Sequence, residues 1–398
     1  MKKRIITWVL LLMLITAEIC PVKIQGAVQP APEISAPGAV LMEPSTGTVL
    51  YEKNGEEQRS PASITKIMTL LLIFEALEDG QITLEEEAVT SAYAKSMGGS
   101  QVFLEEGEKQ TVETLIKCIV VASGNDASVV MAEHLAGSEE EFVKRMNEKA
   151  RELGMIHTQY VDCCGLTDSD AHYTTASDVA IVSRELITRF PRILNYSSIW
   201  MENIIHRTAQ GEKEFCLTNT NKLIRSYEGC IGLKTGSTSV AKYCVSAVAR
   251  RGEMTLLAVV MGAPDAKVRF KDAAALLDYG FGKCNLYLDE NRKNPDPVPV
   301  KGGVKKEVAC RYTGEFRYLD TEGKNLSQIE KKIVYMKNLQ APVKKGDIVG
   351  EAQYLLDGKM VGKTDIVAAK SVKKAGLWDY IKHIRKRMIK GDDYSADG

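Results

Sequence analysis

The sequence predicts an α+β protein in which an antiparallel sheet is flanked by helices and followed by a small all-β region. Three observations predict this fold class. Two strand-like stretches, 38–42 and 48–51, are joined by a turn that contains Pro44 and Gly47, and a helical pattern follows. Three more strand-like stretches then follow one another between residues 230 and 262. Strands in direct succession favour hairpins, so the sheet is predicted to be antiparallel.

The composition is that of a globular protein with more than one domain. The chain has 398 residues, of which 44% are hydrophobic and 26% are charged. A chain of this length exceeds what one hydrophobic core usually fills, so we expect two domains. Lysine plus arginine (52) equals aspartate plus glutamate (52), which leaves no overall positive charge to attract a nucleic acid. We therefore expect no nucleic-acid partner.

The first 27 residues have the pattern of a secretory signal peptide. Residues 1–4 carry three cations, and residues 5–19 then form a nearly continuous apolar run. The run is shorter than the roughly 20 residues that a spanning helix needs, and Gly26 and Ala27 supply small side chains near a cleavage point. The pattern predicts an exported protein at the outer face of the cytoplasmic membrane. An uncleaved anchor is the alternative.

Helical periodicity dominates the chain after the first hairpin. Four stretches carry apolar residues at helical spacing: 61–77, 112–149, 177–187 and 267–277. The second stretch is interrupted by the polar string Ser123-Gly-Asn-Asp126, where a helix break would direct polar side chains at one spot. We expect these helices and the sheet to form one domain over residues 28–284.

A second, β-rich domain is predicted over residues 285–370. The proline-rich string at 294–299 marks a linker. Three short alternating stretches follow, at 306–312, 332–336 and 347–355, and each predicts a strand. No constellation of catalytic side chains falls in this part of the sequence.

The last residues, 371–398, are predicted to form an amphipathic helix and a tail. Leu377, Ile381 and Met388 repeat at helical spacing and are interleaved with lysines and arginines. A basic amphipathic helix of this kind favours binding of residues 375–390 to an anionic membrane surface. A solvated helix or a segment that binds a protein partner is the alternative.

Three short motifs carry the chemistry: Ser63-Ile-Thr-Lys66, Ser123-Gly-Asn125 and Lys234-Thr-Gly236. A serine hydroxyl becomes a good nucleophile when a neighbouring base takes its proton. On a helix, Lys66 projects from the same face as Ser63, so it is the candidate base. It must then be partly neutral, and burial together with the charge of Lys234 would lower its pKa.

The remaining motif positions suit proton transfer and substrate binding. Ser123 is placed to relay a proton towards a leaving amine, and Asn125 offers a donor and an acceptor to a substrate amide. Gly236 would let a substrate main chain lie close against a strand. We assign the two N–H groups that an acyl transition state needs to the backbones of Ser63 and Ser237.

Nine cysteines are present, and their pairing does not follow from the sequence. Most lie in apolar or strand-like runs, where a buried free thiol is expected. Adjacent Cys163 and Cys164 are the exception, since such a pair in a loop could oxidise or bind metal. No CxxC pair or histidine cluster supports a metal site, so we expect no metal and no cofactor. His172 is interpreted as a loop residue.

The flanks of the three motifs resemble those of a known family. The strings Ser60-Pro-Ala-Ser-Ile-Thr-Lys66, Val121-Ala-Ser-Gly-Asn-Asp-Ala127 and Gly232-Leu-Lys-Thr-Gly-Ser-Thr238 resemble the signatures of the penicillin-recognising serine enzymes. Within these enzymes, the chain is similar to the low-molecular-mass D-alanyl-D-alanine carboxypeptidases over nearly its whole length. The resemblance implies their fold, in which a transpeptidase-like catalytic domain combines an antiparallel sheet flanked by helices with a helical subdomain.

The same resemblance implies a serine-type carboxypeptidase that acts on peptidoglycan stem peptides ending in D-Ala-D-Ala. Ser63 would attack the carbonyl of the penultimate D-alanine and form an acyl-enzyme that water hydrolyses. β-Lactams would acylate the same serine. The resemblance does not assign the base of either step, and we choose Lys66 for both. In this family an arginine downstream of the third motif binds the terminal carboxylate. The matching residue is Arg269, and Thr235 would share that task.

One residue departs from the family pattern. Ile231 stands where relatives commonly have an aspartate, and we expect this difference to affect a local turn or loop contact and not the chemistry.

Three other functions are alternatives to this interpretation. A class A β-lactamase would need a glutamate-bearing loop, and no ExxLN string follows Asn125. D,D-endopeptidase activity on cross-links would use the same residues. A non-catalytic wall-binding protein would be expected to have damaged motifs, and these are intact.

Overall fold

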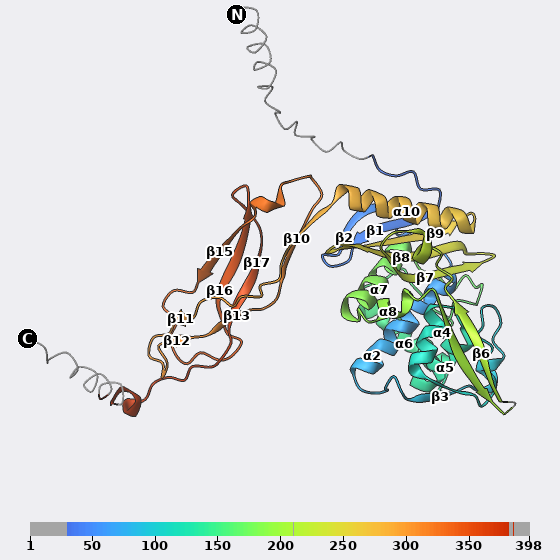
Figure 1. Cartoon of the computed structure of the whole chain (residues 1–398), viewed down its shortest axis with the longest axis horizontal. Helices are drawn as coiled ribbons and strands as arrows, with labels where there is room; N and C mark the ends of the chain where they lie inside the picture. Colours follow the sequence, from blue (N-terminus) through green and yellow to red (C-terminus); the bar gives the residue numbers. More distant parts are fainter. Residues whose placement is uncertain (1–29, 210, 382–384, 386–398) are drawn as a thin grey trace, which may run out of the picture. The chain divides into compact units, whose positions relative to one another are not determined.

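The computed structural model describes residues 30–209, 211–381 and 385 (Figure 1). The predicted signal peptide, residues 1–27, lies outside this part of the chain. A five-stranded sheet forms the centre of the larger region, in the order β2-β1-β9-β8-β7. Its strands are β1 (Gly38–Glu43), β2 (Thr48–Lys53), β7 (Cys230–Thr238), β8 (Lys242–Arg251) and β9 (Met254–Ala263). All neighbouring strands are antiparallel, as predicted.

Both faces of this sheet are covered by helices, which is why β8 and β9 are nearly continuous apolar runs. On one face, α10 (Ala266–Lys283) packs Leu276 and Leu277 against Leu256 and its neighbours. The opposite face packs against α7 (Ala176–Arg189), with Val259 in that second layer. Figure 1 shows α10 and α7 on opposite sides of the sheet. The predicted sheet flanked by helices is confirmed.

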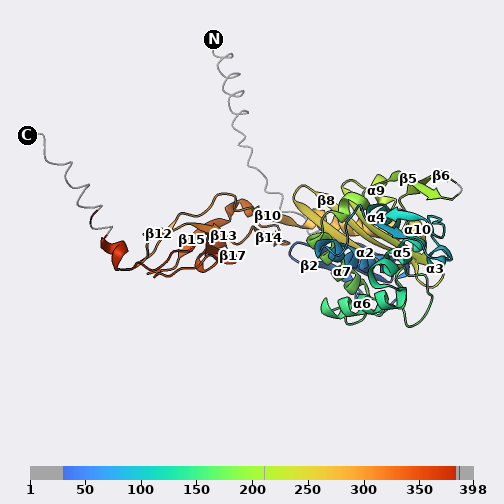
Figure 2. The same cartoon turned by 90° about the horizontal axis from the view of Figure 1, so that it is seen from below.

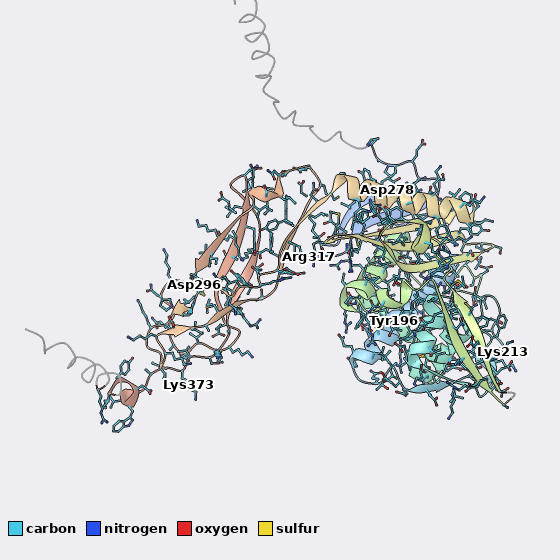
Figure 3. All side chains as sticks on the ribbon, viewed as in Figure 1. Tyr196, Lys213, Asp278, Asp296, Arg317 and Lys373 are labelled. Carbon is cyan, nitrogen blue, oxygen red and sulfur yellow. The ribbon has the colours of Figure 1, made fainter. Side chains whose placement is uncertain are left out.

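The predicted helical subdomain is also present. Its helices are α2 (Lys66–Glu78), α3 (Ala92–Lys95), α4 (Val112–Val120), α5 (Asn125–Ala136), α6 (Glu139–Glu152) and α8 (Ile193–Ser197). The prediction of two helical segments over 112–149 is incomplete. Three helices form, because Gly137 at φ 82° ends α5 and the Ser138 hydroxyl caps α6. Tyr196, labelled in Figure 3, joins α8 to α4 by a 2.9 Å hydrogen bond from its hydroxyl to Glu113.

The helix predicted over 61–77 begins as a tight turn. Ala62–Thr65 form a 3₁₀ turn, and α2 starts at Lys66. Ala62 has φ 48°, in the left-handed region that residues other than glycine seldom adopt. Side chains three residues apart eclipse one another in a 3₁₀ turn. The turn therefore places Ser63 and Lys66 one above the other.

In the larger region, two pairs of strands were not predicted from the sequence. β5 (Met201–Thr208) and β6 (Gly211–Thr218) form an antiparallel hairpin, which is labelled in Figure 2. β3 (Glu87–Val89) pairs with β4 (Lys109–Thr111). β6 is mostly exposed and rich in charged residues, so no apolar run marks it as a strand. The short helix α9 (Leu223–Ser226) then leads into β7.

The region that follows α10 is β-rich, as predicted. A four-stranded antiparallel sheet has the order β13-β17-β16-β15, and the strand pairs β10-β14 and β11-β12 accompany it. The strands are β10 (Asn285–Asp289), β11 (Val298–Pro299), β12 (Glu307–Val308), β13 (Cys310–Tyr312), β14 (Phe316–Asp320), β15 (Glu330–Tyr335), β16 (Ile348–Leu356) and β17 (Lys359–Ala368). This region has its own core, in which the rings of Phe316 and Tyr354 stack with centroids 3.7 Å apart.

Part of the predicted amphipathic helix over 375–390 is described. Residues 377–381 are helical, and Leu377 and Trp378 are each 75% exposed. Residues 382–384 and 386–390 of the prediction lie outside the described part. No helix in the described ranges has the length and apolar character needed to cross a membrane.

Candidate active site

Lys66 lies against Ser63 at the start of α2. Its Nζ is 3.1 Å from Ser63 Oγ, and it donates to Asn125 Oδ1 at 2.6 Å and to the main-chain carbonyl of Cys164 at 2.7 Å. Lys66 is completely buried. Burial lowers its pKa below the ordinary lysine value, because the ammonium loses its hydration and all three partners are uncharged.

Lys234 is a second completely buried lysine, carried into the site by β7. Its Nζ donates to Ser123 Oγ at 2.8 Å and to the carbonyl of Thr235 at 2.9 Å. Burial lowers the pKa of Lys234 well below its usual range, and the positive charges of Lys66 and Arg269 lower it further. Repulsion from Lys66 therefore acts on the pKa of Lys234. The predicted lowering of the Lys66 pKa by the charge of Lys234 is not confirmed, because burial is the cause for Lys66.

Ser123 and Asn125 reach the site from the break between α4 and α5. Ser123 adopts φ 63°, and both side chains are buried. Asn125 Nδ2 donates to the carbonyl of Gly98 at 2.7 Å, and this contact orients Oδ1 towards Lys66. The predicted helix break therefore directs both polar side chains at one spot.

β7 lies directly beside the turn that holds Ser63. A Cβ atom at Gly236 would lie 2.9 Å from the main-chain nitrogens of Ser63 and Ile64. Cβ atoms in folded proteins do not come this close to other heavy atoms. Only glycine allows this approach. β7 is an outer strand of its sheet, and Ser237, the next residue along it, is exposed. Main-chain groups on this side of β7 are therefore available to an extended ligand.

Arg269 lies on α10 against the same strand. Its Nη1 donates to the carbonyls of Gly236 at 3.1 Å and Cys244 at 3.3 Å, and its Nε is buried without a hydrogen-bond partner among the described residues. Thr235 donates its hydroxyl hydrogen to Thr220 at 2.6 Å. A guanidinium oriented in this way presents a fixed positive charge close to Gly236.

Sequence reasoning missed the loop over residues 161–165, which packs against α2. The carbonyl of Cys164 accepts from Lys66. Gly165 has φ 76° and lies so close to the Ser63 turn that a Cβ atom would fall 1.8 Å from the carbonyl oxygen of Ala62. The acceptor is a main-chain atom, so no side-chain pattern could have identified Cys164.

His172 supports this loop. The N–H of Val161 donates to its Nδ1 at 3.1 Å, and its Nε2 is 2.8 Å from Thr65 Oγ1. Burial lowers the pKa of His172, which favours the neutral ring that these contacts require. Among the hydrogen bonds of the described residues, none joins His172 to Ser63 or Lys66.

The chain is similar to known proteins in both sequence and structure. A family profile described as D-alanyl-D-alanine carboxypeptidase matches residues 25–265, and one described as penicillin-binding protein 5, C-terminal domain, matches residues 282–374. D-alanyl-D-alanine carboxypeptidase DacF of Bacillus subtilis is 41% identical over 348 residues, which are 87% of this chain and 88% of the relative. D-alanyl-D-alanine carboxypeptidase DacC of Escherichia coli is 32% identical over 372 residues, 88% of each chain.

Solved structures of penicillin-binding proteins have the same fold as this chain. Penicillin binding protein 5 from Haemophilus influenzae superimposes with a TM-score of 0.70 at 30% identity, over 87% of this chain and 99% of that one. The DD-transpeptidase of Streptomyces K15 gives a TM-score of 0.59 at 29% identity, over 63% of this chain and 99% of that one. The protein therefore belongs to the serine-type D-alanyl-D-alanine carboxypeptidase family of low-molecular-mass penicillin-binding proteins.

Proposed function

We propose that this chain removes the terminal D-alanine from peptidoglycan stem peptides through an acyl-enzyme on Ser63. The observation that carries the proposal is the 3.1 Å contact between Ser63 Oγ and the buried Nζ of Lys66. A serine acyl transferase needs a base within hydrogen-bond reach of its hydroxyl, and a buried lysine is the kind of lysine that can become neutral.

The contacts of Lys66 support its role as that base. A neutral amine has two N–H groups and one lone pair. The carbonyl of Cys164 and Oδ1 of Asn125 can only accept hydrogen bonds, so they occupy both N–H groups. The lone pair is then left for the hydroxyl hydrogen of Ser63, which is the proton that the base must take.

In the proposed reaction, Ser63 is first acylated and the acyl-enzyme is then hydrolysed. Ser63 Oγ forms a bond to the carbonyl carbon of the penultimate D-alanine while its proton passes to Lys66. Ser123, which accepts a hydrogen bond from Lys234, gives its hydroxyl proton to the leaving nitrogen and takes up the proton that Lys66 received, so that Lys66 is neutral again. The C–N bond breaks and D-alanine leaves. The neutral Lys66 then takes a proton from water as the water attacks the ester, and it returns this proton to Ser63 Oγ when the C–Oγ bond breaks and the shortened peptide leaves. A β-lactam would open its amide bond on the same serine.

Two further groups are proposed to orient the substrate. The oxyanion would lie between the main-chain N–H groups of Ser63 and Ser237, and the close approach at Gly236 supports this pairing. The terminal carboxylate would bind Arg269 and Thr235, because a buried guanidinium with an unpaired Nε suits an anion. Asn125 would hold the amide of the scissile region.

We also propose a role for each domain and a cellular location. Residues 28–284 would be the catalytic domain of an exported protein, and 285–370 the β-rich domain. Residues 375–390 would hold the protein at the outer face of the cytoplasmic membrane. In support, the helical residues 377–381 expose large apolar side chains, including Leu377 and Trp378.

Release of D-alanine tests the proposal. The protein is incubated with a pentapeptide that ends in D-Ala-D-Ala, with the same peptide as its C-terminal amide, and with a cross-linked muropeptide dimer. We expect D-alanine from the free acid, a much slower reaction with the amide, and no D-alanine with Ser63→Ala. Absence of D-alanine release by the wild type contradicts carboxypeptidase action. Monomer formation from the dimer would assign endopeptidase activity to the same site.

A further inference from the structure

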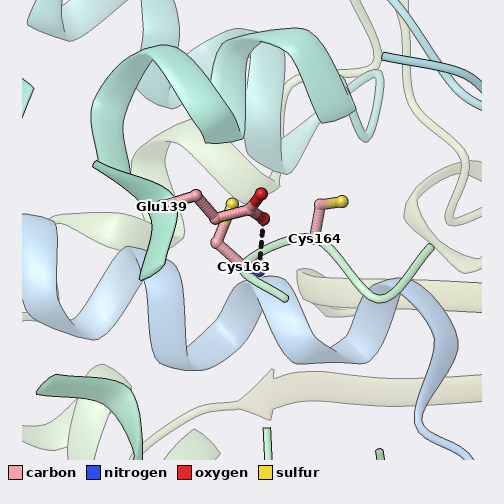
Figure 4. Close-up of side chains that lie close together, drawn as sticks. All are labelled: Glu139, Cys163 and Cys164. Atoms are coloured by element: carbon pink, nitrogen blue, oxygen red, sulfur yellow. Dashed lines mark hydrogen bonds between the residues drawn. The ribbon is translucent and has the colours of Figure 1, made fainter. Parts of the chain in front are cut away.

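A cluster of metal-ligand side chains lies outside the proposed catalytic groups. Glu139, Cys163 and Cys164 bring one carboxylate oxygen and two sulfur atoms within 4.8 Å of one another (Figure 4). Glu139 is the first residue of α6, and the two cysteines lie in the loop that packs against α2. Both cysteines are completely buried and are not joined in a disulfide.

The carboxylate of Glu139 is held in place from both sides. Its Oε1 accepts from the main-chain N–H of Cys163 at 2.9 Å, and its Oε2 accepts from the hydroxyl of Tyr93 at 2.6 Å. These contacts fix the position of the carboxylate beside Cys163. They leave each oxygen with a further lone pair for a cation.

We propose that Glu139, Cys163 and Cys164 form a binding site for a thiophilic divalent cation such as Zn²⁺. Two sulfur atoms and one carboxylate oxygen are ligands that zinc takes in proteins, with a fourth position left for water. Ligand atoms around a tetrahedral zinc are about 3.3–3.8 Å apart, given bond lengths of about 2.0–2.3 Å. The three ligand atoms lie within 4.8 Å of one another, so binding would draw them closer together.

Protons compete with the cation at this site. Burial raises the pKa of Cys163 well above its usual range, and the neighbouring thiol and Glu139 raise it further. The cation must therefore displace protons from the thiols.

The same two cysteines connect this cluster to the Ser63 site. The carbonyl of Cys163 accepts from the hydroxyl of Thr69 at 2.5 Å, and the carbonyl of Cys164 accepts from Lys66 at 2.7 Å. Their sulfur atoms thus lie within 4.8 Å of the Glu139 carboxylate, while their carbonyls accept hydrogen bonds from two residues of α2. A bound cation would fix the loop between the two helices and would stabilise the folded state.

Cadmium is the probe for the first test, because its thiolate complexes absorb in the ultraviolet. The reduced whole protein is titrated with Cd²⁺ at constant pH. We expect one equivalent to bind with a charge-transfer band, loss of that equivalent in Cys163→Ser/Cys164→Ser, and at least about tenfold weaker binding in Glu139→Gln. The matched control is Cys118→Ser/Cys216→Ser, which removes one buried and one exposed thiol elsewhere and should bind as the wild type does.

A second measurement does not depend on any variant. X-ray absorption of the wild type with one equivalent of Zn²⁺ should show two sulfur ligands at about 2.3 Å together with oxygen ligands. A zinc shell of nitrogen and oxygen only would overturn the proposal. So would a wild type without the cadmium band, or an undiminished band in folded Cys163→Ser/Cys164→Ser.

Discussion

A Cβ atom on Gly236 would lie 2.9 Å from the main-chain nitrogen of Ser63, so β7 and the turn that carries the proposed nucleophile meet backbone to backbone. This contact joins the third motif to the first. It also places the N–H group of Ser63 beside the strand along which we propose that the substrate lies.

Gly236→Ala is therefore predicted to push the strand and the turn apart. We expect the free energy of unfolding to fall by about 1–3 kcal/mol through overpacking, and acylation by a chromogenic β-lactam to slow by about 100-fold through misplacement of reacting groups. Gly314→Ala is the control, because a Cβ there meets no atom within 4 Å. Equal acylation rates for the two variants would contradict the role given to this contact.

Lys66→Arg tests the proposed base. Arginine keeps the positive charge but cannot lose its proton in a protein, so acylation is expected to fall by about 10²–10⁴-fold. Stopped-flow measurement of β-lactam acylation gives the rate. A variant that retains a tenth or more of the wild-type rate would remove Lys66 from this role.

The acylation rate of the wild type should also depend on pH with a defined sign. The base acts in its neutral form, and burial lowers the pKa of Lys66 from the ordinary lysine value of 10.5. The rate is therefore expected to rise with pH through the lowered pKa and to level off below pH 10.5. A rate that rises only around pH 10.5 or above would show that Lys66 titrates as an ordinary lysine.

Arg269→Gln tests the proposed carboxylate contact. We expect kcat/KM for a peptide that ends in D-Ala-D-Ala to fall by about 10- to 100-fold, because the variant loses a hydrogen bond to a charged group. The reaction of the C-terminal amide should change little, because it lacks the carboxylate. If both substrates lose activity equally, Arg269 supports the fold around Gly236 and Cys244 and does not recognise the carboxylate.

The proposed membrane contact is tested by ending the chain at Lys374. Sedimentation with vesicles that contain anionic lipid should bring down the full chain and leave the truncated protein in solution. Both forms should be acylated by a β-lactam at the same rate, because the deletion lies outside the Ser63 site. Equal binding of both forms to the vesicles would exclude residues 375–390 as the anchor.

Much of the fold could be predicted because its signals are local. The hairpin of β1 and β2, the consecutive strands β7 to β9 and the break at Ser123 all follow from apolar spacing and turn residues. The hairpin of β5 and β6 was missed because β6 is polar and mostly exposed. The end of α5 at Gly137 was missed because residues 112–149 were interpreted by their helical periodicity alone, although Gly137 and Ser138 are a helix-stop and a helix-start signal.

The contacts in the site could be predicted where the two residues are close together in the sequence. Ser63 and Lys66 are three residues apart, so their contact follows from helical geometry. Ser123 and Lys234 are 111 residues apart, and only the resemblance to a family linked them. The carbonyl of Cys164 could not be predicted at all, because its role depends on where the loop passes α2.

Intact-mass analysis after exposure to a labelled penicillin tests the central claim most directly. The account predicts that the wild type gains the mass of one penicilloyl group and that peptide mapping places it on Ser63. Ser63→Ala, folded to the same extent by circular dichroism, should gain none. A wild type that stays unmodified, or a Ser63→Ala variant that is labelled as completely as the wild type, would contradict the account.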